Sequence, residues 1–422
     1  MDKIVVRGGQ RLTGSVRVSG SKNAALPIMA ASILGDGPLI IDNVPRLRDV
    51  RTMLEILSQL GVRGEHREDG SVYLEPVDPS RVTADYEQVS TMRGSICVLG
   101  PLLARRGRAV VSMPGGCVIG VRPIDLHLKG LRAMGAAVTV ERGYVMAEAR
   151  RLVGADVYLG GAYGSSVLAT ANVMMAATLA DGQTVIDCAA FEPEVADLAA
   201  CLNAMGARIS GAGSPAITIE GVRRLSGARH RVIPDRIEAG TLMCAAAITG
   251  GDVIVENVIA SHLGAVVDKL RQVGVSVEKV NGSVRVCGTP PYKSTDLTTL
   301  PYPGIPTDLQ AQIMAVLSVA DGISVVTEKV FPDRFIHVAE LNRMGADIRK
   351  EGSSAIIRGV PRLSGSHVMA SDLRAGAALI VAGLVASDQT EIHRVYHIDR
   401  GYERIEDRLA NLGADVRRAE DT

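Results

Sequence analysis

Residues 131–149, LRAMGAAVTVERGYVMAEA, contain the pattern that decides the fold of this chain. Apolar residues at helical spacing lead to Gly135, and an alternating apolar stretch broken by a glycine follows. The residues therefore predict a helix ended by a glycine cap and then a pair of strands. The same pattern closes at six glycines, Gly61, Gly135, Gly206, Gly274, Gly345 and Gly413. Six repeats of about 70 residues account for the whole chain.

Each repeat contains a second shared piece upstream, as in MAATLADGQTVIDCAAF (175–191). It predicts an Ala-rich apolar helix, a turn and a β-branched strand, so one repeat is an α/β unit of strand, helix, strand, helix and two strands. Helices that are apolar on most faces indicate helices inside and sheets outside. Since one core rarely grows beyond roughly 250–300 residues, we expect two lobes of three repeats. The segments GSVRVSGSKN (14–23) and RHRVIPDRIE (229–238) occupy corresponding places and would connect the lobes, whose cleft is the default active site.

The composition excludes several classes of protein. The 422 residues include 46 basic and 46 acidic residues, so the formal net charge of zero disfavours a nucleic-acid binder. Aromatic residues make up 3% of the chain, too few for base-stacking platforms. The six cysteines form no CxxC pair, which excludes a zinc knuckle and a disulfide framework. The start shows no secretory signal and no apolar run is long enough to span a bilayer, so we expect a soluble cytoplasmic protein.

Cys117 is the candidate reactive cysteine. It follows Pro-Gly-Gly and precedes Gly120, on a loop with Arg122 nearby, where a thiol of lowered pKa could react. The glycines would also allow the loop to act as a lid. The other five cysteines lie in apolar runs, where a free cysteine is usually a small hydrophobic residue.

Three charged residues stand where a helix begins, and each has a structural and a chemical interpretation. Lys22, after a Gly-Ser turn, is either a solvated lysine behind a plain N-cap or part of an anion site. In PTDLQAQ (306–312), Thr307 or Asp308 is a helix cap, or Asp308 is a general base. Asp372 in SDLRAG carries the same two alternatives.

Five arginines lie near a glycine or a helix start: Arg93, Arg122, Arg334, Arg374 and Arg400. They suggest a polyanionic ligand, with plain surface solvation as the alternative for each. A metal site is poorly supported, because His393 and His397 are four residues apart in a strand-like stretch without the glutamate of a zinc-protease helix.

Five stretches of the sequence are distinctive enough to be compared with known families: SGSKNAALP (19–27), PGGCVIGVRPIDLHLKGL (114–131), PYPGIPTDLQAQ (301–312), FPDRFIHVAELNRMGAD (331–347) and VYHIDRGYERIEDRL (395–409). On these stretches the chain resembles, essentially end to end, the UDP-N-acetylglucosamine enolpyruvyl transferases of the EPSP synthase-like group. The resemblance implies a two-lobed inside-out α/β barrel of six βαβαββ repeats, three per lobe. Lobe one would comprise residues 1–21 and 233–422 and lobe two residues 22–232, with the active site in the cleft between them.

The resemblance also implies a reaction and roles for single residues. The family transfers the enolpyruvyl group of phosphoenolpyruvate to the 3-hydroxyl of UDP-N-acetylglucosamine, releases phosphate and opens peptidoglycan synthesis, through a tetrahedral ketal and without metal or organic cofactor. Cys117 would be the general acid and the target of fosfomycin, and Asp308 would take the proton of the sugar hydroxyl. Phosphoenolpyruvate would be held by Lys22, Asn23, Arg122, Arg334, Arg374 and Arg400, of which Lys22 and Arg400 would also be catalytic. The sugar nucleotide would be held by Asn23, Arg93, Arg122, Pro123, Ile124, Asp125, Leu126, Ser166, Val167, Asp308 and Val330, with Asp372 on the charged floor of the cleft.

The chain departs from the family in the segment YGSSVLATANVMM (163–175). Leu168 replaces the usual glycine of a Ser-Val-Gly-Ala-Thr stretch, the family's lysine just upstream is missing, and Pro332 follows Phe331 where a polar residue is common. Two alternatives therefore stay open: transfer to another acceptor, such as a different uridine nucleotide or shikimate 3-phosphate, and a silent sugar-nucleotide binder. We expect small-molecule partners only, no nucleic acid or membrane, and a monomer or weak oligomer.

Overall fold

The computed structural model describes residues 2–115 and 123–420, which form two compact units. The N-terminal unit comprises residues 20–115 and 123–233, and the C-terminal unit comprises residues 2–19 and 234–420. The chain therefore passes from one unit to the other at residues 19–20 and 233–234, within the two segments that the sequence marks as connections. The boundaries expected from the resemblance fall after residues 21 and 232.

The N-terminal unit consists of three repeats, and each builds one four-stranded sheet. The first comprises β14 (Ala228–Arg231), α1 (Lys22–Ala31), β3 (Leu39–Asp42), α2 (Arg48–Gln59), β4 (Val62–His66) and β5 (Val72–Pro76). The second comprises β6 (Thr83–Ala84), α3 (Tyr86–Val89), α4 (Leu99–Arg106), β7 (Arg108–Ser112), α5 (Asp125–Ala133), β8 (Ala137–Glu141) and β9 (Tyr144–Glu148). The third comprises β10 (Asp156–Tyr158), α6 (Val167–Ala177), β11 (Gln183–Asp187), α7 (Pro193–Ala204), β12 (Arg208–Ser210) and β13 (Ala216–Glu220).

The C-terminal unit repeats the same plan three times. Its first repeat comprises β2 (Thr13–Arg17), α8 (Arg236–Ile248), β15 (Asp252–Glu256), α9 (Gly264–Val273), β16 (Ser276–Val280) and β17 (Ser283–Cys287). The next comprises β18 (Leu297–Thr299), α10 (Gln310–Leu317), β19 (Ile323–Glu328), α11 (His337–Arg343), β20 (Asp347–Glu351) and β21 (Ser354–Arg358). The last comprises β22 (His367–Met369), α12 (Leu373–Gly383), β23 (Gln389–His393), α13 (Ile405–Asn411), β24 (Asp415–Glu420) and β1 (Asp2–Arg7).

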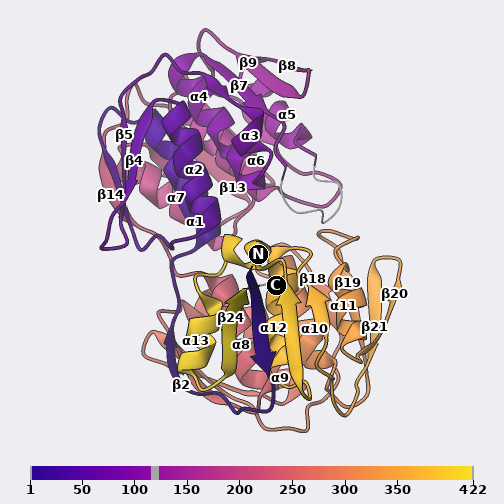
Figure 1. Cartoon of the computed structure of the whole chain (residues 1–422). Coiled ribbons are helices and arrows are strands. Elements are labelled where there is room, and N and C mark those ends of the chain that lie inside the picture. The colour runs from indigo at the N-terminus through magenta and orange to yellow at the C-terminus, as the bar shows by residue number, and fades with distance from the viewer. Residues whose placement is uncertain (1, 116–122, 421–422) are drawn as a thin grey trace. The chain divides into compact units, whose positions relative to one another are not determined.

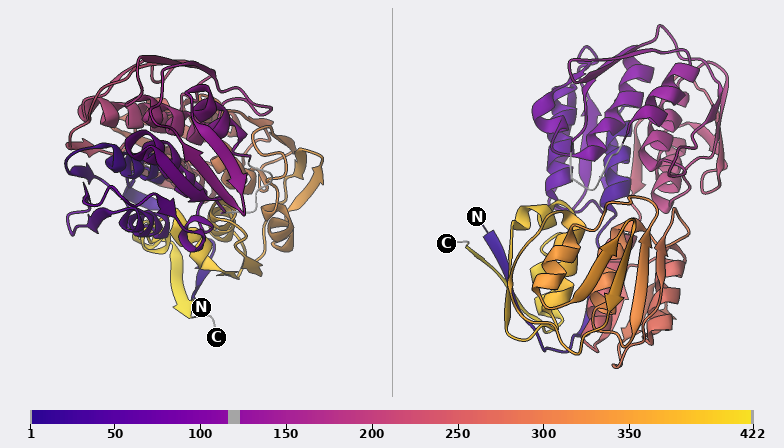
Figure 2. Two further views of the ribbon diagram at one scale, coloured as in Figure 1. Left: turned by 90° about the horizontal axis from the view of Figure 1, so that it is seen from above. Right: turned by 90° about the vertical axis from the view of Figure 1, so that its right-hand side faces the viewer.

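All six sheets have one strand order. The first strand of a repeat pairs in parallel with the second, the second pairs antiparallel with the fourth, and the fourth pairs antiparallel with the third. The strand β1 is the fourth strand of the last repeat, so β1 and β24 lie side by side, as both views in Figure 2 show. Every sheet in the described part of the chain is open and none closes into a barrel, whereas the α/β class and the six repeats are confirmed.

Two repeats exchange their first strands across the chain connections. In four repeats the first strand leads directly into the first helix, but β2 precedes α1 in the sequence and pairs with β15 of the other unit's sheet. In the same way β14 precedes α8 but pairs with β3. The C-terminal unit therefore takes β2 from residues 2–19 and the rest of this repeat from residues 234–420, whereas β14 lies at the end of the segment that forms the N-terminal unit.

The closing glycines explain why each second helix ends where it does. Gly61, Gly135, Gly206, Gly274, Gly345 and Gly413 all have positive φ between 73° and 104°. This left-handed conformation is strained for residues with a side chain, and it turns the chain from the helix into the hairpin or edge strand that follows. The predicted glycine caps are confirmed.

Five helices, α1, α6, α8, α10 and α12, are buried on nearly all sides. Every residue from Ile237 to Ile248 in α8 and from Leu373 to Gly383 in α12 is buried, and α8, α10 and α12 pack against one another. Strands present only alternate residues to these helices, as the buried Val284 and Val286 of β17 show beside α8. Figure 1 shows α8, α10 and α12 with strands beside them, so the expectation of central helices and outer sheets is confirmed. No helix in the described residues is long and apolar enough to cross a membrane.

Candidate functional site

Asp308 stands at the centre of a buried charge cluster in the C-terminal unit. It lies in a 3₁₀ turn, η4 (Thr307–Leu309), which leads directly into α10. Arg334 Nη1 donates to Oδ1 at 2.7 Å, and Arg374 Nη2 donates to Oδ2 at 3.0 Å. The Asp308 side chain remains 25% exposed. Neither η4 nor α10 has a side-chain cap, so the cap interpretation of Thr307 and Asp308 is wrong.

The two arginines of this cluster are buried, so the surface-solvation alternative is wrong for both. Arg334 is 6% exposed and Arg374 is 1% exposed. Burial by itself would lower the pKa of Arg334, but the carboxylates of Asp308 and Asp372 outweigh it and raise the pKa. Burial also opposes the charge of Arg374, and Tyr402, Asp308 and Asp235 together raise its pKa. Both guanidinium groups therefore stay charged within an apolar unit.

Asp372 takes the structural role of the two that its sequence context allows, that of a helix cap. It is the N-cap of α12, and its Oδ1 accepts from the backbone N–H groups of Arg374 at 2.7 Å and Ala375 at 3.0 Å. Its charge also acts on Arg334, as the pKa of that residue shows. The cap is confirmed, and it fixes the helix residue from which the Arg374 side chain extends.

Glu328 is a structural member of the site that the sequence analysis missed. It is fully buried at the end of β19, and its Oε1 accepts from the Thr299 hydroxyl at 2.5 Å and from the backbone N–H groups of Val330 at 2.8 Å and Phe331 at 2.9 Å. Its Oε2 accepts from the Thr307 hydroxyl at 2.9 Å. One carboxylate thus joins the turn before Asp308 to the segment that leads to Arg334.

A polar network lies beneath Arg374 among the central helices. The guanidinium carbon of Arg374 is 5.3 Å from the centre of the Tyr402 ring. The Tyr402 hydroxyl lies 2.9 Å from Thr241 Oγ1, and Gln312 Nε2 donates to both oxygens at 3.1 Å. Thr241 and Gln312 are buried in α8 and α10, so two helices hold the ring on which Arg374 rests. The sequence signal that could have revealed this network is the presence of the polar Thr241 and Gln312 within otherwise apolar helices.

Two further predicted residues of the C-terminal unit are half-buried. Arg400 ends the 3₁₀ helix η5 (Val395–Arg400), which packs against α12. Val330 lies between Glu328 and Arg334, on the segment that Glu328 holds. The structure therefore brings Asp308, Arg334, Arg374 and Asp372 together and leaves Arg400 and Val330 on neighbouring elements of the same unit.

Lys22 is the buried cation of the N-terminal unit. It is the first residue of α1, is 7% exposed and donates from Nζ to Asp49 Oδ2 at 3.0 Å. Asp49 lies in the first turn of α2 and is 3% exposed. The cap of α1 is the Ser21 hydroxyl, which accepts from Ala24 N–H at 3.4 Å. The expectation of an N-cap is confirmed, but the expectation of a solvated lysine is wrong.

Arg93 fastens the described residues on both sides of the segment 116–122. It begins the 3₁₀ helix η2 (Arg93–Val98), and its guanidinium donates to the carbonyl oxygens of Pro114 at 3.5 Å and Pro123 at 3.2 Å. Cys117 and Arg122 fall within that segment and lie outside the described residues. Arg93 therefore holds Pro114 and Pro123 in place, a role different from the contact with a nucleotide that the resemblance implies.

The remaining predicted nucleotide residues lie at helix starts. Asn23 is half-buried in the first turn of α1. Pro123 and Asp125 are exposed, Ile124 is buried and Leu126 is half-buried, where α5 begins. The Ser166 hydroxyl caps α6 by accepting from Ala169 N–H at 3.3 Å, and Val167 follows it, half-buried. Leu168, the departure from the family pattern, packs against the core of this unit.

Asn172 is a buried residue of α6 that completes the junction between η2 and α4. Its Oδ1 accepts from Gly100 N–H at 2.7 Å, and its Nδ2 donates to the Ile96 carbonyl and to His127 Nδ1, both at 2.9 Å. A Cβ on Gly100 would lie 2.2 Å from the Asn172 carbonyl oxygen, so the close approach requires glycine. Burial, with the charge of Arg93, lowers the pKa of His127 to about 3.

Three of the other five cysteines are unsuited to nucleophilic chemistry. Cys97, Cys201 and Cys244 are buried, and burial raises the pKa of each thiol to about 12. The interpretation of these three as small hydrophobic residues is confirmed, because a thiol with so high a pKa is a poor nucleophile.

Comparison with known proteins identifies the family. The family model for EPSP synthase (3-phosphoshikimate 1-carboxyvinyltransferase) matches residues 6–409. UDP-N-acetylglucosamine 1-carboxyvinyltransferase 2 of Carboxydothermus hydrogenoformans is 55% identical over 423 residues, which cover 100% of both chains. UDP-N-acetylglucosamine 1-carboxyvinyltransferase of Desulforapulum autotrophicum is 54% identical over 99% of this chain and 100% of its own.

Solved structures agree with the fold. The enolpyruvyl transferase NikO from Streptomyces tendae matches with a TM-score of 0.89 and 24% identity, over 100% of this chain and 99% of its own. EPSP synthase from Acinetobacter baumannii matches with a TM-score of 0.75 and 21% identity over all of both chains. These low identities support the architecture alone, whereas the family model and the relatives above 50% identity carry the assignment. The chain belongs to the EPSP synthase family of carboxyvinyl (enolpyruvyl) transferases.

Proposed function

We propose that this protein transfers the enolpyruvyl group of phosphoenolpyruvate to the 3-hydroxyl of UDP-N-acetylglucosamine and releases phosphate, the first committed step of peptidoglycan synthesis. The names of relatives that are 53–55% identical over nearly the whole chain support the substrates. The single observation that carries the chemistry is the carboxylate of Asp308, partly exposed and held in one orientation by two buried arginines.

Asp308 is the proposed general base. An alcohol adds to an enol ether only if its proton leaves, and a positioned carboxylate is a suitable acceptor. Arg334 and Arg374 fix both oxygens of that carboxylate, and Glu328 holds the turn before it. A base with its orientation fixed in advance needs no reorganisation at the moment of reaction.

The proposed general acid is Cys117, which gives its proton to the methylene carbon of phosphoenolpyruvate while the sugar oxygen bonds to the neighbouring carbon. Removal of a proton from the resulting methyl group then restores the double bond and expels phosphate. We infer that Arg93 supports this step by fastening Pro114 and Pro123, the described residues on either side of the loop. Because Cys117 carries the proposed reactive thiol, it is also the proposed target of fosfomycin.

Phosphoenolpyruvate carries up to three negative charges, so its binding site must contain several cations. We assign this role to Lys22, Asn23, Arg122, Arg334, Arg374 and Arg400. Lys22 suits it, because Asp49 holds its ammonium group at the positively charged start of α1. Arg374 also suits it, because among the described residues its Nε and Nη1 have no hydrogen-bond partner.

The sugar nucleotide is assigned to helix starts in the N-terminal unit and to two residues of the C-terminal unit. The residues are Asn23, Arg93, Arg122, Pro123, Ile124, Asp125, Leu126, Ser166, Val167, Asp308 and Val330. The start of α6 suits a diphosphate, because its N-cap is the neutral Ser166 hydroxyl and no acidic residue lies in its first turn. Leu168 leaves this arrangement unchanged, since it packs against the core.

The proposed reaction uses two small molecules and needs no metal or organic cofactor. We place it in the cytoplasm because both substrates are phosphorylated metabolites made inside the cell. No nucleic acid or membrane takes part in this proposal.

The experiment that tests the proposal measures phosphate release and product mass together. The protein is given phosphoenolpyruvate with no acceptor, with UDP-N-acetylglucosamine, with a second uridine sugar nucleotide, or with shikimate 3-phosphate. The expected result is release only with UDP-N-acetylglucosamine and a product heavier by one enolpyruvyl group. Release with a different acceptor would replace the proposed substrate, and nucleotide binding without any release would make the protein a silent binder.

A further inference from the structure

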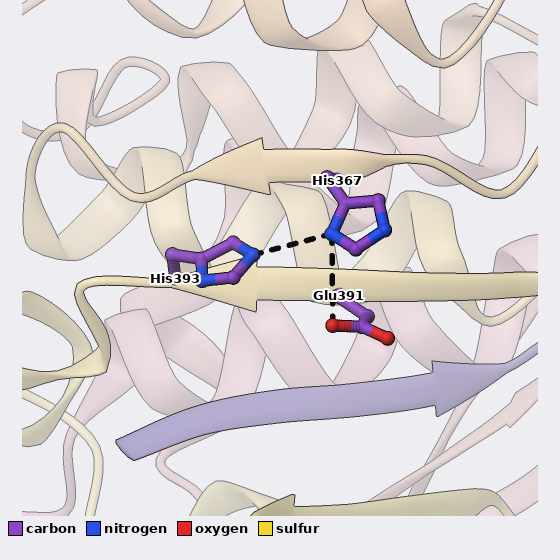
Figure 3. A group of neighbouring side chains, drawn as sticks. All are labelled: His367, Glu391 and His393. Atoms are coloured by element: carbon purple, nitrogen blue, oxygen red, sulfur yellow. Dashed lines mark hydrogen bonds and ion pairs between the residues drawn. The ribbon is translucent and has the colours of Figure 1, made fainter. Parts of the chain in front are cut away.

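Three potential metal ligands meet on the outer face of the last sheet of the C-terminal unit. His367 comes from β22, and Glu391 and His393 come from the neighbouring strand β23, as Figure 3 shows. The parallel register places His367 opposite Glu391 and Met369 opposite His393. The three side chains therefore share one face because residues two apart on a strand point the same way.

The distances match those between ligands of one ion. His367 Nδ1 lies 3.4 Å from His393 Nε2 and 3.6 Å from Glu391 Oε2, and the ligand atoms of all three residues lie within 4.8 Å of one another. Two ligands of a tetrahedral Zn²⁺, each about 2.0–2.1 Å from the ion, are separated by about 3.3–3.4 Å. Small side-chain rotations are enough to place all three around one ion, with water completing its shell.

We propose that His367, Glu391 and His393 form a site for a divalent transition-metal ion, Zn²⁺ or one of its neighbours Cu²⁺ and Ni²⁺. Two imidazoles with one carboxylate favour these ions over Mg²⁺ and Ca²⁺, which prefer a shell of oxygen ligands. The site is independent of the proposed enolpyruvyl transfer, which uses none of these three residues.

The surroundings of Glu391 supply a further feature of a metal site. Gln389 Nε2 donates to Oε1 at 2.8 Å, which orients the carboxylate as such hydrogen bonds orient the ligands of a bound ion. The site is open to solvent, since the His367 side chain is 75% exposed.

Lys3 is the competitor of the ion. Its Nζ lies 2.7 Å from Glu391 Oε2, the same oxygen that faces His367. Binding of a cation must displace this ammonium group, which also repels the ion. Two kinds of variant should therefore change the affinity for the ion in opposite directions. Loss of a ligand weakens binding, and loss of the Lys3 charge strengthens it.

The consequence of binding is mechanical. The ion would fasten β22 to β23, the two strands that flank α12 in the sequence, and β22 ends three residues before the cap Asp372. A bound ion that the unfolded chain does not hold raises the melting temperature in proportion to the logarithm of its concentration.

The test is a calorimetric titration of the whole chain, stripped with a chelator, with Zn²⁺, Ni²⁺ and Mg²⁺. We expect one Zn²⁺ per chain that is lost or weakened at least tenfold in His367→Ala and in His393→Ala, with no binding of Mg²⁺. Lys3→Met should bind Zn²⁺ severalfold more tightly than the wild type, which cannot result from a folding defect. His66→Ala, at the end of β4 in the other unit, is the matched control and should bind as the wild type does.

The absorption spectrum of bound Co²⁺ distinguishes this site from one formed by cysteines. Thiolate ligands give intense charge-transfer bands, and imidazole and carboxylate ligands do not. The proposal is overturned if the double variant His367→Ala/His393→Ala binds Zn²⁺ as tightly as the wild type. It is equally overturned if the wild type shows no binding at millimolar Zn²⁺, or if Lys3→Met binds more weakly.

Discussion

The two units share one fold and differ in what stands at the start of their first helices. In the N-terminal unit the hydroxyls of Ser21 and Ser166 cap α1 and α6, and in the C-terminal unit the carboxylates of Asp235 and Asp372 cap α8 and α12. The middle helix of each unit, α4 or α10, has no side-chain cap and is entered through a 3₁₀ turn. The same scaffold therefore presents two different sets of charges.

This difference separates two tasks. Neutral caps leave the positive ends of α1 and α6 available to an anion, which suits the phosphates of a nucleotide. Acidic caps add negative charge, and the C-terminal unit balances it with the buried Arg334 and Arg374, which hold Asp308. The repeated fold provides the framework, and the departures from repetition provide the chemistry.

The largest expected effect is the loss of the base. Asp308→Asn keeps the size of the side chain but cannot accept a proton, so turnover should fall by roughly 10²–10⁴-fold in a phosphate-release assay. Asp333→Asn is the matched control, because Asp333 is exposed and its charged partner in the described part of the chain is Lys350, at a distance of 3.8 Å. Equal loss in both variants, or none in Asp308→Asn, would contradict the role of Asp308 as the base.

A smaller effect is expected from the residue that holds the base in place. Glu328→Gln replaces an acceptor of four hydrogen bonds by an amide whose NH2 group must face either the Thr307 hydroxyl at the place of Oε2 or the other three donors at the place of Oε1. Turnover should fall by roughly 10–100-fold, because displacement of a positioned group by about 1 Å costs that much. The free energy of unfolding should fall by about 2–3 kcal/mol.

Glu351→Gln, at the end of β20 in the same sheet, is the control for this variant. It should change neither turnover nor stability, since Glu351 is exposed and forms a surface ion pair with Arg349. A Glu328→Gln enzyme with normal turnover would show that Asp308 needs no support from the strand.

The acid sensitivity of the two units should be similar. Burial lowers the pKa of His127 to about 3 in the N-terminal unit and the pKa of His337 to about 4 in the C-terminal unit. In the unfolded chain each histidine takes up its proton near pH 6.5, so between pH 6.5 and these lower values the unfolded state binds more protons. Stability therefore falls as the pH falls through this window, by about 2–3 kcal/mol per histidine between pH 7.5 and 4.5.

Urea unfolding at these two pH values measures the loss. His127→Gln retains an acceptor for the Asn172 amide and should remove that unit's share of the pH dependence without affecting the share of His337. An unchanged pH dependence in both His127→Gln and His337→Gln would contradict the assignment of acid sensitivity to these two side chains.

The smallest expected effect is the loss of a neutral cap. Ser166→Ala removes the acceptor for Ala169 N–H and should cost about 1 kcal/mol of stability, measured by urea unfolding. It should also weaken nucleotide binding more than Ser165→Ala, which leaves the cap intact. If the two variants bind the nucleotide equally well, the start of α6 has no part in holding it.

The repeat structure could be predicted from the sequence because its signals are local. A glycine that must adopt positive φ, as Gly135 and Gly274 do, marks a helix end regardless of what surrounds it. The pairing of β2 with β15 and of β14 with β3 could not be predicted in detail, because which sheet a strand joins depends on partners far away in the sequence: Thr13 pairs with Asp252, and Ala228 with Leu39.

The charged site was only partly predictable for the same reason. Asp308 and Arg374 stood out because a helix start is visible in the sequence, but the ion pair between them joins residues 66 positions apart. Glu328 was missed although it occupies an inward position of the strand ISVVTE, where its burial could have been noticed. His393 was compared with His397, four residues away, whereas its neighbour on the sheet is His367.

The measurement that tests the central claim most directly is the mass of the product formed in heavy water from phosphoenolpyruvate and UDP-N-acetylglucosamine. Addition followed by elimination passes through a methyl group that has gained one deuteron from the general acid. The account therefore predicts a product heavier by one enolpyruvyl group, with deuterium in its methylene carbon. A product that carries a phosphoryl group instead, or an enolpyruvyl product without deuterium, would contradict it.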